Sequence, residues 1–484
     1  MPARHLHIAA EVPEEIREGI AHLRESLEVP EGFPDAVLAQ VRERVASGPL
    51  DLGARQDLTA IEFVTIDPES SMDLDQAMFI ERAAEGANGA AFTVWYAIAD
   101  VAAWVAPGGA IDGEAHRRGQ TFYAPSERIP LHPSEVSEQA ASLLDDGTPR
   151  PALVWKIDLN AQGNQVTGTV VRATVRSRER LSYVQVQGWL DAGTAPEWAQ
   201  LLREVGTLRQ QLEAARGGVS LKLPEQEITT DERGWHISYR APLPVEDWNA
   251  QISLLTGMAA AKIMLDGGVG ILRTLPPAEP SAVERLRRTA RSLHIDWPTD
   301  MGYPDFVRSL DVSQPTHLAM MTACTALFRG AGYTLVAAGV DPATVQHGAL
   351  AANYAHTTAP LRRLVDRYVG EICVHLCAGI AVPRWTLDAL AALPDEMRDS
   401  DSRAKKFERG NVDLVEALVM SQRVGQVFAA VVVELDQKSG GTVSIEHPAI
   451  EARLKADGLE LGSEVNVRLE SVDLVAGKVV LCRV

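Results

Sequence analysis

The sequence predicts a multidomain α+β protein in three parts: a small helical domain over residues 1–56, a large α+β domain over 57–420, and a five-stranded β-barrel over 421–484. Three observations predict this. Hydrophobic residues recur at helical spacing near the start of the chain, short strand-like runs follow from residue 61, and strand-like runs return after a long helical stretch. A chain of 484 residues also has the length of roughly three domains.

Two amphipathic helices are predicted in the first domain, over residues 13–27 and 34–46. Ile16, Ile20 and Leu23 fall on one face of the first helix. The connection VPEGF contains proline and glycine, so the pair forms a helical hairpin or a helix-turn-helix. Because this segment carries more acidic than basic residues, we expect a packing or capping module, and its acidity argues against DNA as a ligand.

The large domain begins with strands. The runs IEFVTI, QAMFIE, FTVWYAIA, ALVWKIDL and VTGTVVRATV are separated by glycine, proline and asparagine signals. Residues 90–110 are apolar enough to raise the possibility of a membrane span. Asp100 interrupts that window and Pro107 punctuates its end, so a buried strand running into a helix is the better interpretation, and we expect no membrane association.

Helices dominate the second half of the large domain. They are expected over residues 195–216, 249–265, 282–293, 317–330, 358–377 and 386–423. Strands followed by helices are typical of an α+β domain. The last 60 or so residues then give five short strands with glycine turns, which favours a barrel of the OB type over a small β-sandwich tail. Phe428 is the barrel's one aromatic residue, so we expect a modest contribution to single-strand binding.

The charge of the chain limits which partners it can bind, and its cysteine content indicates the cellular compartment. The chain has 65 acidic and 46 basic residues and a formal charge of −19, which argues against non-specific coating of nucleic acid although a local basic patch would escape this count. The four cysteines show neither a CxxC pair nor zinc spacing, which indicates buried thiols in a reducing compartment. The first residues contain no apolar run of signal-peptide length, so we expect a cytoplasmic protein. We also expect a monomer.

The segment TIDPESSMDLDQA, residues 65–77, contains three aspartates that could hold a cation. A predicted strand ends at Asp67, and Asp73 and Asp75 would project to the same side of an extended segment. Such carboxylates repel one another unless a cation or basic group neutralises them, and oxygen ligands favour magnesium or manganese. A calcium loop is excluded because Met72 and Met78 occupy the positions of its glycine and glutamate. A solvated acidic turn stays open as the alternative.

The segment NYAHTTAPLRRLVDRY, residues 353–368, indicates a phosphate site. Thr358 is a suitable helix N-cap and proline follows in the first turn, so a helix is expected to start here. Arg362 and Arg363 then lie where the helix itself favours an anion, so they suit a phosphate better than they suit the helix. The alternative, pairing with Asp366 four residues after Arg362, leaves Arg363 unexplained. Metal-binding carboxylates and paired arginines together indicate hydrolysis of a phosphodiester.

These motifs resemble the ribonuclease II, or RNB-domain, family of exoribonucleases. TIDPESSMDLDQA is similar to the family's Thr-Ile-Asp motif with clustered aspartates, and VWYAIADVAAWV to the strand that follows it. QTFYAPSERIPLHPSEVSEQAASL is similar to the block around a Tyr-x-Pro, and YAHTTAPLRRLVD to the Tyr-x-His-x-Thr-Ser-Pro-Ile-Arg-Arg signature. The resemblance covers about residues 55 to 420, and the barrel resembles the RNA-binding domain that ends most members.

The resemblance implies an enzyme that removes nucleotides processively from the 3′ end of single-stranded RNA and releases nucleoside 5′-monophosphates. Asp67, Asp73 and Asp75 match three of the family's four magnesium-site aspartates, with manganese as a possible substitute. Asp75 would be the most sensitive ligand. Tyr123 matches the tyrosine that stacks on the terminal base. Arg362 matches the arginine at the scissile phosphate, and the basic position beside it is Arg363.

The sequence departs from the family pattern at four places. Gln76 occupies the fourth aspartate position, where its amide oxygen could still ligate metal. Leu221 stands where a phenylalanine partners the stacking tyrosine, and Asn249 falls where a Glu-Glu pair contacts the terminal ribose. The N-terminal segment is also too short and too helical for paired cold-shock barrels. The sequence therefore leaves an active, metal-dependent exoribonuclease as the leading hypothesis and an inactive RNA-binding protein that keeps the fold as the second. A third, a regulator that binds DNA through residues 1–56, is disfavoured by the acidity of that segment.

Overall fold

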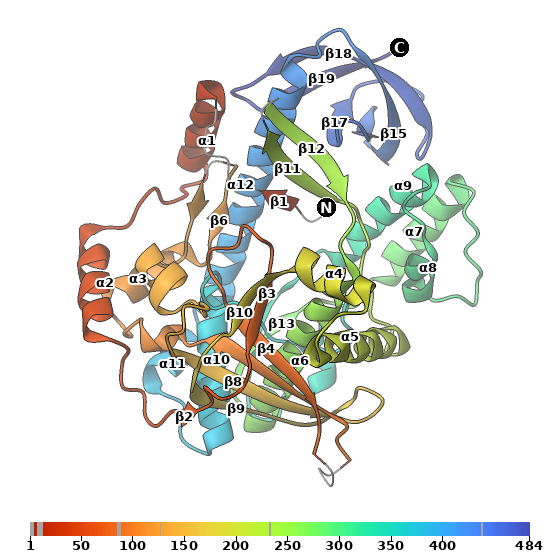
Figure 1. The fold of residues 1–484 in the computed structure, drawn as a ribbon. Helices are drawn as coiled ribbons and strands as arrows, with labels where there is room; N and C mark the ends of the chain where they lie inside the picture. The colour runs from red at the N-terminus through yellow and green to blue at the C-terminus, as the bar shows by residue number, and fades with distance from the viewer. Residues whose placement is uncertain (1–3, 7–12, 85–88, 126, 232–233, 437–438) are drawn as a thin grey trace.

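The computed structural model describes residues 4–6, 13–84, 89–125, 127–231, 234–436 and 439–484. A seven-stranded sheet covered by helices forms the lower body of the view in Figure 1. The long helix α12, Leu393–Ser421, rises from this body to a β-barrel at the C-terminal end. The α+β architecture with a C-terminal barrel confirms the predicted fold class.

The large sheet has the strand order β10-β3-β4-β5-β8-β9-β2. Its inner neighbours are antiparallel, and parallel pairs add β10 and β2 at the two edges. Its strands are β2 Gln56–Asp57, β3 Val64–Asp67, β4 Gln76–Arg82, β5 Phe92–Ala99, β8 Arg150–Leu159, β9 Gln165–Val175 and β10 Glu179–Ser182. Strand β5 is buried along almost its whole length. The apolar window around it is therefore a central strand, as predicted.

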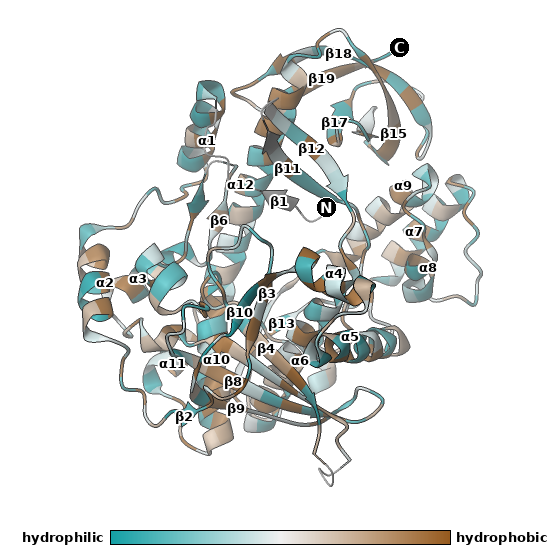
Figure 2. Cartoon of the chain, viewed as in Figure 1, coloured by the Kyte–Doolittle hydropathy of each residue, from teal (hydrophilic) through white to brown (hydrophobic). Residues whose placement is uncertain are grey.

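Helices cover both faces of this sheet, which explains why its central strands are apolar on both sides. Helices α5 Glu197–Ala215, α6 Pro244–Gly267 and α10 Leu364–Ala378 contribute to the core on one face. Helices α2 Asp35–Ser47 and α3 Ala110–Arg118 contribute to the core on the other face. Figure 2 shows hydrophobic residues along β8 and β9 and polar residues along the outer side of α5.

The two N-terminal helices form as predicted but pack against different cores. Helix α1, Glu14–Ser26, buries Ile16 and Ile20 against Phe407 and Leu414 of α12. Helix α2 buries Val37 in a second core, which it shares with the 3-10 helix Val101–Ala103 and with Ile111 of α3. Both helices are thus joined to the larger body, as a packing module would be.

Two predicted helices have different bounds in the structure. Helix α10 begins at Leu364, six residues after the expected start at Thr358, because residues 359–363 form a turn whose Ala359 N–H donates to the Asp366 carboxylate at 2.8 Å. The expected helix over 386–423 is split into α11, Arg384–Ala389, and α12, where Pro394 occupies the first turn. Proline suits a helix start and interrupts a helix interior.

A hairpin lies where the sequence indicated mainly helix. Strands β11, Glu225–Asp231, and β12, Gly234–Arg240, pair antiparallel, and β1, Arg4–Leu6, adds to β11 in parallel. Ile228 and Ile237 of the hairpin pack with Val412 and Val415 of α12. The hairpin therefore fills the junction between α12 and the barrel (Figure 1).

The smaller elements complete the body. They are β6 Phe122–Tyr123, β7 Arg128–Ile129, α4 Tyr183–Ala192, β13 Gly270–Thr274, α7 Pro280–Ser292, α8 Tyr303–Ser309, α9 Pro315–Cys324 and β14 Gly332–Val336. Short 3-10 helices span Val101–Ala103, Thr325–Phe328 and Pro342–Val345, and a π-helix spans Glu135–Ala140.

The five predicted C-terminal strands close into a barrel of order β15-β16-β17-β19-β18. They are β15 Val427–Leu435, β16 Gly441–Ile445, β17 Ile450–Leu454, β18 Glu464–Asp473 and β19 Lys478–Arg483. Phe428 is 9% exposed and belongs to the barrel core, so it offers little surface on which a base could stack. Within the described part of the chain, no helix combines the length and the apolarity needed to cross a membrane.

Candidate active site

The three aspartates of the predicted cation site lie at the point where β3 leads into β4. Asp67 is the last residue of β3, and β4 begins at Gln76. Arg180 holds the loop between them through hydrogen bonds from its guanidinium to the carbonyl groups of Glu69 and Ser71, at 3.0 and 2.6 Å. The charge of Asp73 acts on both Asp67 and Asp75, so all three carboxylates share one neighbourhood.

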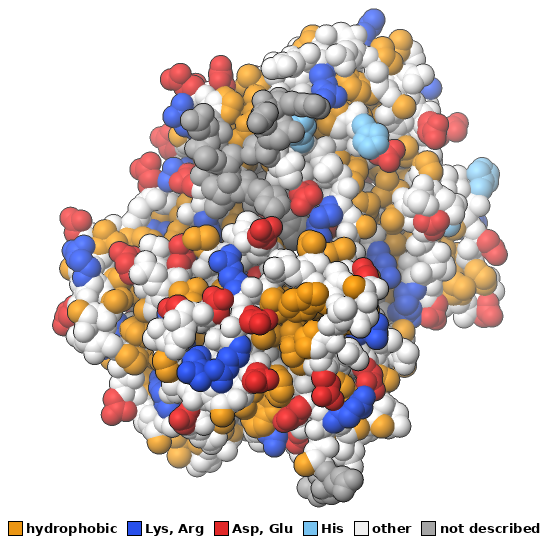
Figure 3. All heavy atoms as spheres, viewed as in Figure 1, with side chains coloured by type: hydrophobic (Ala, Val, Ile, Leu, Met, Phe, Trp, Pro, Cys, Tyr) orange, Lys and Arg blue, Asp and Glu red, His pale blue; other side chains and the backbone are white. Residues whose placement is uncertain are grey.

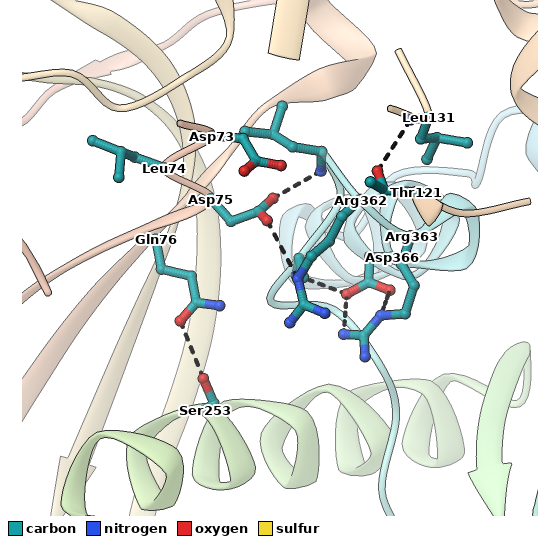
Figure 4. Close-up of polar contacts among 12 residues, drawn as sticks. Asp73, Leu74, Asp75, Gln76, Thr121, Leu131, Ser253, Arg362, Arg363 and Asp366 are labelled. Atoms are coloured by element: carbon teal, nitrogen blue, oxygen red, sulfur yellow. Dashed lines mark hydrogen bonds and ion pairs between the residues drawn. The ribbon is translucent and has the colours of Figure 1, made fainter. Parts of the chain in front are cut away.

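Asp75 joins this loop to the arginine segment that precedes α10. Its Oδ1 accepts a hydrogen bond from the Leu361 N–H at 2.7 Å, and its Oδ2 lies 3.8 Å from Nε of Arg362 (Figure 4). The side chain is buried. Burial, followed by the charge of Asp73, raises the pKa of the Asp75 carboxyl well above its usual value. A cation beside these oxygens would relieve that cost.

Asp67 differs from the other two aspartates in how its carboxylate is paired. Burial and the nearby Asp73 charge raise the pKa of Asp67 to about 7, against the opposing influence of Arg362 and Arg180. Its Oδ2 is buried and has no hydrogen-bond partner among the described residues. Buried carboxylate oxygens without a partner are unusual and point to a missing ion or water.

Asp73 is engaged by an arginine that the sequence analysis did not identify. Arg128 of β7 forms one ion pair with Oδ1 of Asp73 and a second with Glu138 of the π-helix. Its side chain is only 9% exposed, so this guanidinium is enclosed beside the carboxylates. The one available signal was local: Arg128 is the basic residue of the segment that also contains Tyr123, and β6 and β7 place the two residues opposite each other.

Gln76 turns away from the aspartates. Its Oε1 accepts hydrogen bonds from the Tyr96 hydroxyl and from the Ser253 hydroxyl of α6, the latter at 3.2 Å. Figure 4 shows the Gln76 side chain directed toward Ser253 of α6, whereas the Asp75 side chain is directed toward Arg362. The amide oxygen expected to complete a metal shell is therefore committed to the sheet and α6 in this structure.

The carboxylate oxygens of the three aspartates are suitable ligands for a hard divalent cation, although the three side chains do not form a closed metal site in this structure. Among the described residues, no three acidic, histidine or cysteine side chains converge closely enough to count as a formed metal centre. Asp67, Asp73 and Asp75 nevertheless present oxygen atoms alone, and Asp67 retains a buried oxygen without a partner. Magnesium accepts one or two carboxylates together with water and phosphate oxygens, so the residues fit this ion.

The two arginines before α10 have different environments. Arg363 makes two hydrogen bonds of 2.8 Å to Asp366, and both side chains are largely buried. Pairing with Asp366, the alternative to a phosphate site, is therefore formed by Arg363 rather than by Arg362, because the turn over 359–363 directs Arg363 toward that carboxylate. Arg362 is 46% exposed beside Asp75 and is free to reach a phosphate. Arg363 serves to fix the turn that carries Arg362.

Three further predicted residues line or flank this region. Tyr123 of β6 is 37% exposed as a whole residue. Burial of its hydroxyl, followed by the charge of Asp73, raises the pKa of its phenol to about 12, so the phenol stays neutral. The Asn249 amide donates a hydrogen bond to the Tyr183 hydroxyl at 3.0 Å. Burial, followed by the charge of Asp67, raises the pKa of Tyr183. Leu221 packs at the edge of the core formed by α7, α8 and α9, so its pairing with Tyr123 stays a prediction.

A buried ion network behind the site fixes α10 against the sheet. Arg172 of β9 donates to Asp100 at 2.9 Å and to Glu371 of α10 at 2.5 Å. Arg55 also reaches Asp100, at 2.8 Å. Because buried charges are tolerated when they are paired in this way, the network sets the position of α10. It thereby sets the position of the Arg362 turn at the start of that helix.

Comparison with known protein families identifies two regions. Residues 55–378 match the RNB domain, and residues 426–484 match the RNase II-type exonuclease C-terminal S1 domain. Ribonuclease R of Mycoplasma genitalium is 26% identical over 400 residues, which are 78% of this chain and 53% of that protein. Exoribonuclease 2 of Klebsiella pneumoniae strain 342 is 26% identical over 414 residues, 81% of this chain and 62% of that protein. The chain thus spans a little over half the length of these relatives.

Solved structures share the fold. Mycoplasma genitalium RNase R in complex with ribose methylated single-stranded RNA superposes with a TM-score of 0.85 at 20% identity, covering 97% of this chain and 78% of that one. Yeast Ssd1, described as a pseudonuclease, superposes with a TM-score of 0.68 at 17% identity, covering 87% of this chain and 53% of that one. The match to the RNB domain covers well over half of the chain. The chain therefore belongs to the RNB-domain family of RNase II-type exoribonucleases.

Proposed function

We propose that this chain is a metal-dependent exoribonuclease that hydrolyses single-stranded RNA from its 3′ end and releases nucleoside 5′-monophosphates. The observation that carries this proposal is the contact between the two sequence motifs. The Leu361 N–H binds Asp75 at 2.7 Å and places the exposed Arg362 guanidinium beside the aspartate group. A phosphodiester held there would have carboxylates for a cation on one side and a fixed positive charge on the other.

The residues of the site would divide the work as follows. Asp67 and Asp75, with the free oxygen of Asp73, would hold a magnesium ion, which supplies activation of water and stabilisation of the leaving oxygen. Arg362 would bind the non-bridging phosphate oxygens, whose negative charge grows in the transition state. Tyr123 would position the terminal nucleotide by stacking, because its ring is exposed while its phenol stays neutral.

The relatives support this proposal at the level of the family. Mycoplasma genitalium RNase R binds single-stranded RNA in the structure described above and has the same fold. Selection of RNA over DNA would depend on contacts to the 2′-hydroxyl group, which distinguishes the two nucleic acids. Removal of one nucleotide at a time would follow from a site that admits only a free end.

A second candidate function is RNA binding without hydrolysis. Two observations favour it: Gln76 replaces an acidic residue and turns away from the site, and Arg128 occupies one oxygen of Asp73. Yeast Ssd1 shows that a pseudonuclease can keep this fold.

Incubation of end-labelled single-stranded RNA with Mg²⁺ or Mn²⁺, with EDTA as control, separates the two functions. We expect metal-dependent release of mononucleotides by the unaltered protein. Asp75→Asn should reduce turnover by about a hundredfold to a thousandfold, the scale seen when a group that stabilises the transition state is removed, while RNA binding persists. Lys405→Met, an exposed change on α12, is the matched control and should leave turnover unchanged. RNA binding without shortening in either metal would establish the second function instead.

A further inference from the structure

The strand pair that carries Tyr123 has two faces with different surroundings. Phe122 of β6 lies opposite Ile129 of β7, and Tyr123 lies opposite Arg128. Because side chains alternate along a strand and directly opposite residues share a face, Phe122 and Ile129 project away from the face of Tyr123. Phe122 and Ile129 are 1% and 2% exposed, whereas Tyr123 is 37% exposed. The pair therefore presents Tyr123 on one face and packs into the protein through the other.

The buried face of β6 and β7 shares a core with the N-terminal segment (Figure 1). Contributions to this core come from α1, the connection between α1 and α2, the two strands and α12. Its buried members are Ile16, Ile20, Val29, Phe122, Ala124, Ile129, Phe407 and Leu414. Tyr123 thus lies between two residues of a core that the N-terminal segment helps to build.

Helix α1 packs closely against α12, which gives the segment a firm base. A Cβ on Gly19 of α1 would come within 2.5 Å of the Leu414 side chain of α12. A Cβ on Gly410 of α12 would in turn come within 2.7 Å of the Leu23 side chain of α1. Since each helix has a glycine where the other inserts a leucine, this close packing fixes α1 against α12.

Polar contacts connect the same segment to both ends of β7. The Arg24 guanidinium of α1 lies 3.1 Å from Oε1 of Glu127, the residue before β7. The buried Arg118 guanidinium donates to the carbonyl of Pro130, the residue after β7, at 3.0 Å and also to the carbonyl of Gly32. The strand is therefore held on both sides by contacts that involve α1 or the connection that follows it.

The outer surface of α1 is unsuited to contact with RNA. Its exposed charged residues are Arg17 and a larger group of glutamates, Glu14, Glu15, Glu18 and Glu25. The other arginine of the helix, Arg24, is only 16% exposed and is paired. Because binding to phosphate groups depends on lysine and arginine, this surface favours a role through packing over a role through RNA contact.

We propose that α1 and residues 27–34 form a positioning element for Tyr123, which supports β6 and β7 through their buried face and so sets how the terminal base of the RNA stacks. This inference rests on the proposed function for the stacking role of Tyr123, and it gives the N-terminal segment a part in that site without direct contact with RNA. Arg24 and Val29 are assigned as positioning residues.

The test measures stacking of a single-stranded RNA whose 3′-terminal base is 2-aminopurine, because the fluorescence of this base falls when it stacks. EDTA is present so that the RNA is not shortened, and the anisotropy of a 5′-fluorescein label reports overall binding. We expect quenching at saturating concentrations of the full chain, and Tyr123→Ala should remove it.

Two changes in the segment should alter stacking while overall binding is kept. Arg24→Glu places a like charge beside Glu127 and should lower the ratio of stacked to unstacked terminal base about twofold to fivefold, the range for loss of one partly exposed ion pair. Adding Glu127→Arg restores opposite charges and should recover the ratio. Val29→Ala should lower it as well, whereas Val205→Ala, the same deletion at a buried position of α5 in a different core, should leave it unchanged.

Several outcomes would overturn the inference. An unchanged ratio in both Arg24→Glu and Val29→Ala would do so, as would an equal loss in Val205→Ala, since stacking would then follow general stability. If Val29→Ala fails to fold, the charge exchange decides, and no recovery in the double variant would contradict the assigned role of Arg24. Quenching that survives Tyr123→Ala would refute the stacking role and this inference with it. Normal stacking without metal-dependent shortening of RNA would refute the proposed hydrolysis alone.

Discussion

Replacement of Glu416 by glutamine should stabilise the protein at alkaline but not at acidic pH. Glu416 of α12 is 3% exposed, and its Oε1 accepts from the Gln226 amide at 2.8 Å and from the Glu451 N–H at 3.4 Å. It therefore joins α12 to both the hairpin and the barrel. Burial raises the pKa of its carboxyl from 4.5 to about 7, and Asp413 contributes in the same direction, although Arg409 lies 3.8 Å from Oε2.

The size of this effect follows from the difference between the folded and unfolded pKa. The folded state binds the proton more tightly, so stability falls as pH rises from 4.5 through 7 and is constant above that range. At about 1.4 kcal/mol for each pH unit, the fully ionised group costs about 3 kcal/mol. At pH 5 the cost is below about 1 kcal/mol. Glutamine can keep the acceptor oxygen for Gln226 and Glu451 without the charge.

Thermal unfolding at pH 8 and pH 5 measures this difference. An unfolding entropy of about 1 kcal/mol/K for a chain of 484 residues converts 3 kcal/mol to a Tm increase of about 3 °C at pH 8, with a change below about 1 °C at pH 5. Asp395→Asn, on the same helix but 72% exposed, is the control and should shift neither value. An equal change at both pH values, or a lower Tm for Glu416→Gln at pH 8, would refute the reasoning.

Two further predictions concern packing and the arginine turn. Gly257→Ala would place its Cβ 2.1 Å from the ring of Tyr354, so we expect a loss of at least about 1–3 kcal/mol in urea unfolding, whereas Gly188→Ala, with no atom within 4 Å, should be neutral or slightly stabilising. Arg363→Met leaves Asp366 as a buried unpaired charge and should cost about 3–5 kcal/mol in the same assay. Replacing Asp366 by leucine in that variant should restore part of the loss, and no recovery would indicate that the pair is not the cause.

The sequence predicted the elements that local patterns define. Strand β5 and the five barrel strands follow from short apolar runs between turn residues, and α1 and α2 from their helical periodicity. The hairpin of β11 and β12 was missed because its stability comes from contacts of Ile228 and Ile237 with α12, more than 170 positions further along the chain. Such a pairing overrides local preference and leaves little trace in a single segment.

The site was predicted as a set of residues but not as a set of contacts. The aspartates and Arg362 were identifiable because each belongs to a distinctive motif whose residues lie close together in the chain. The pairing of Arg363 with Asp366 was not foreseen, because the alternative of an ion pair was considered only at helical spacing, from Arg362, where the structure has a turn. The roles of Arg128 and Ser253 had no comparable signal, since each becomes relevant only when β7 or α6 folds against the aspartate loop.

The contacts of the arginines show how the excess of acidic residues affects the surface that is available to RNA. Acidic and basic side chains are interspersed on the face drawn in Figure 3, and neither sign forms one continuous field. Arginines near the site that could have gripped RNA are engaged within the protein: Arg172 by Asp100 and Glu371, and Arg363 by Asp366. Arg362 differs from these in being half exposed beside the aspartates. Contacts to phosphate groups provide most of the affinity of non-specific binding to nucleic acid. We therefore expect this protein to bind RNA through an end that reaches Arg362 rather than through contacts along the outer surface of the protein.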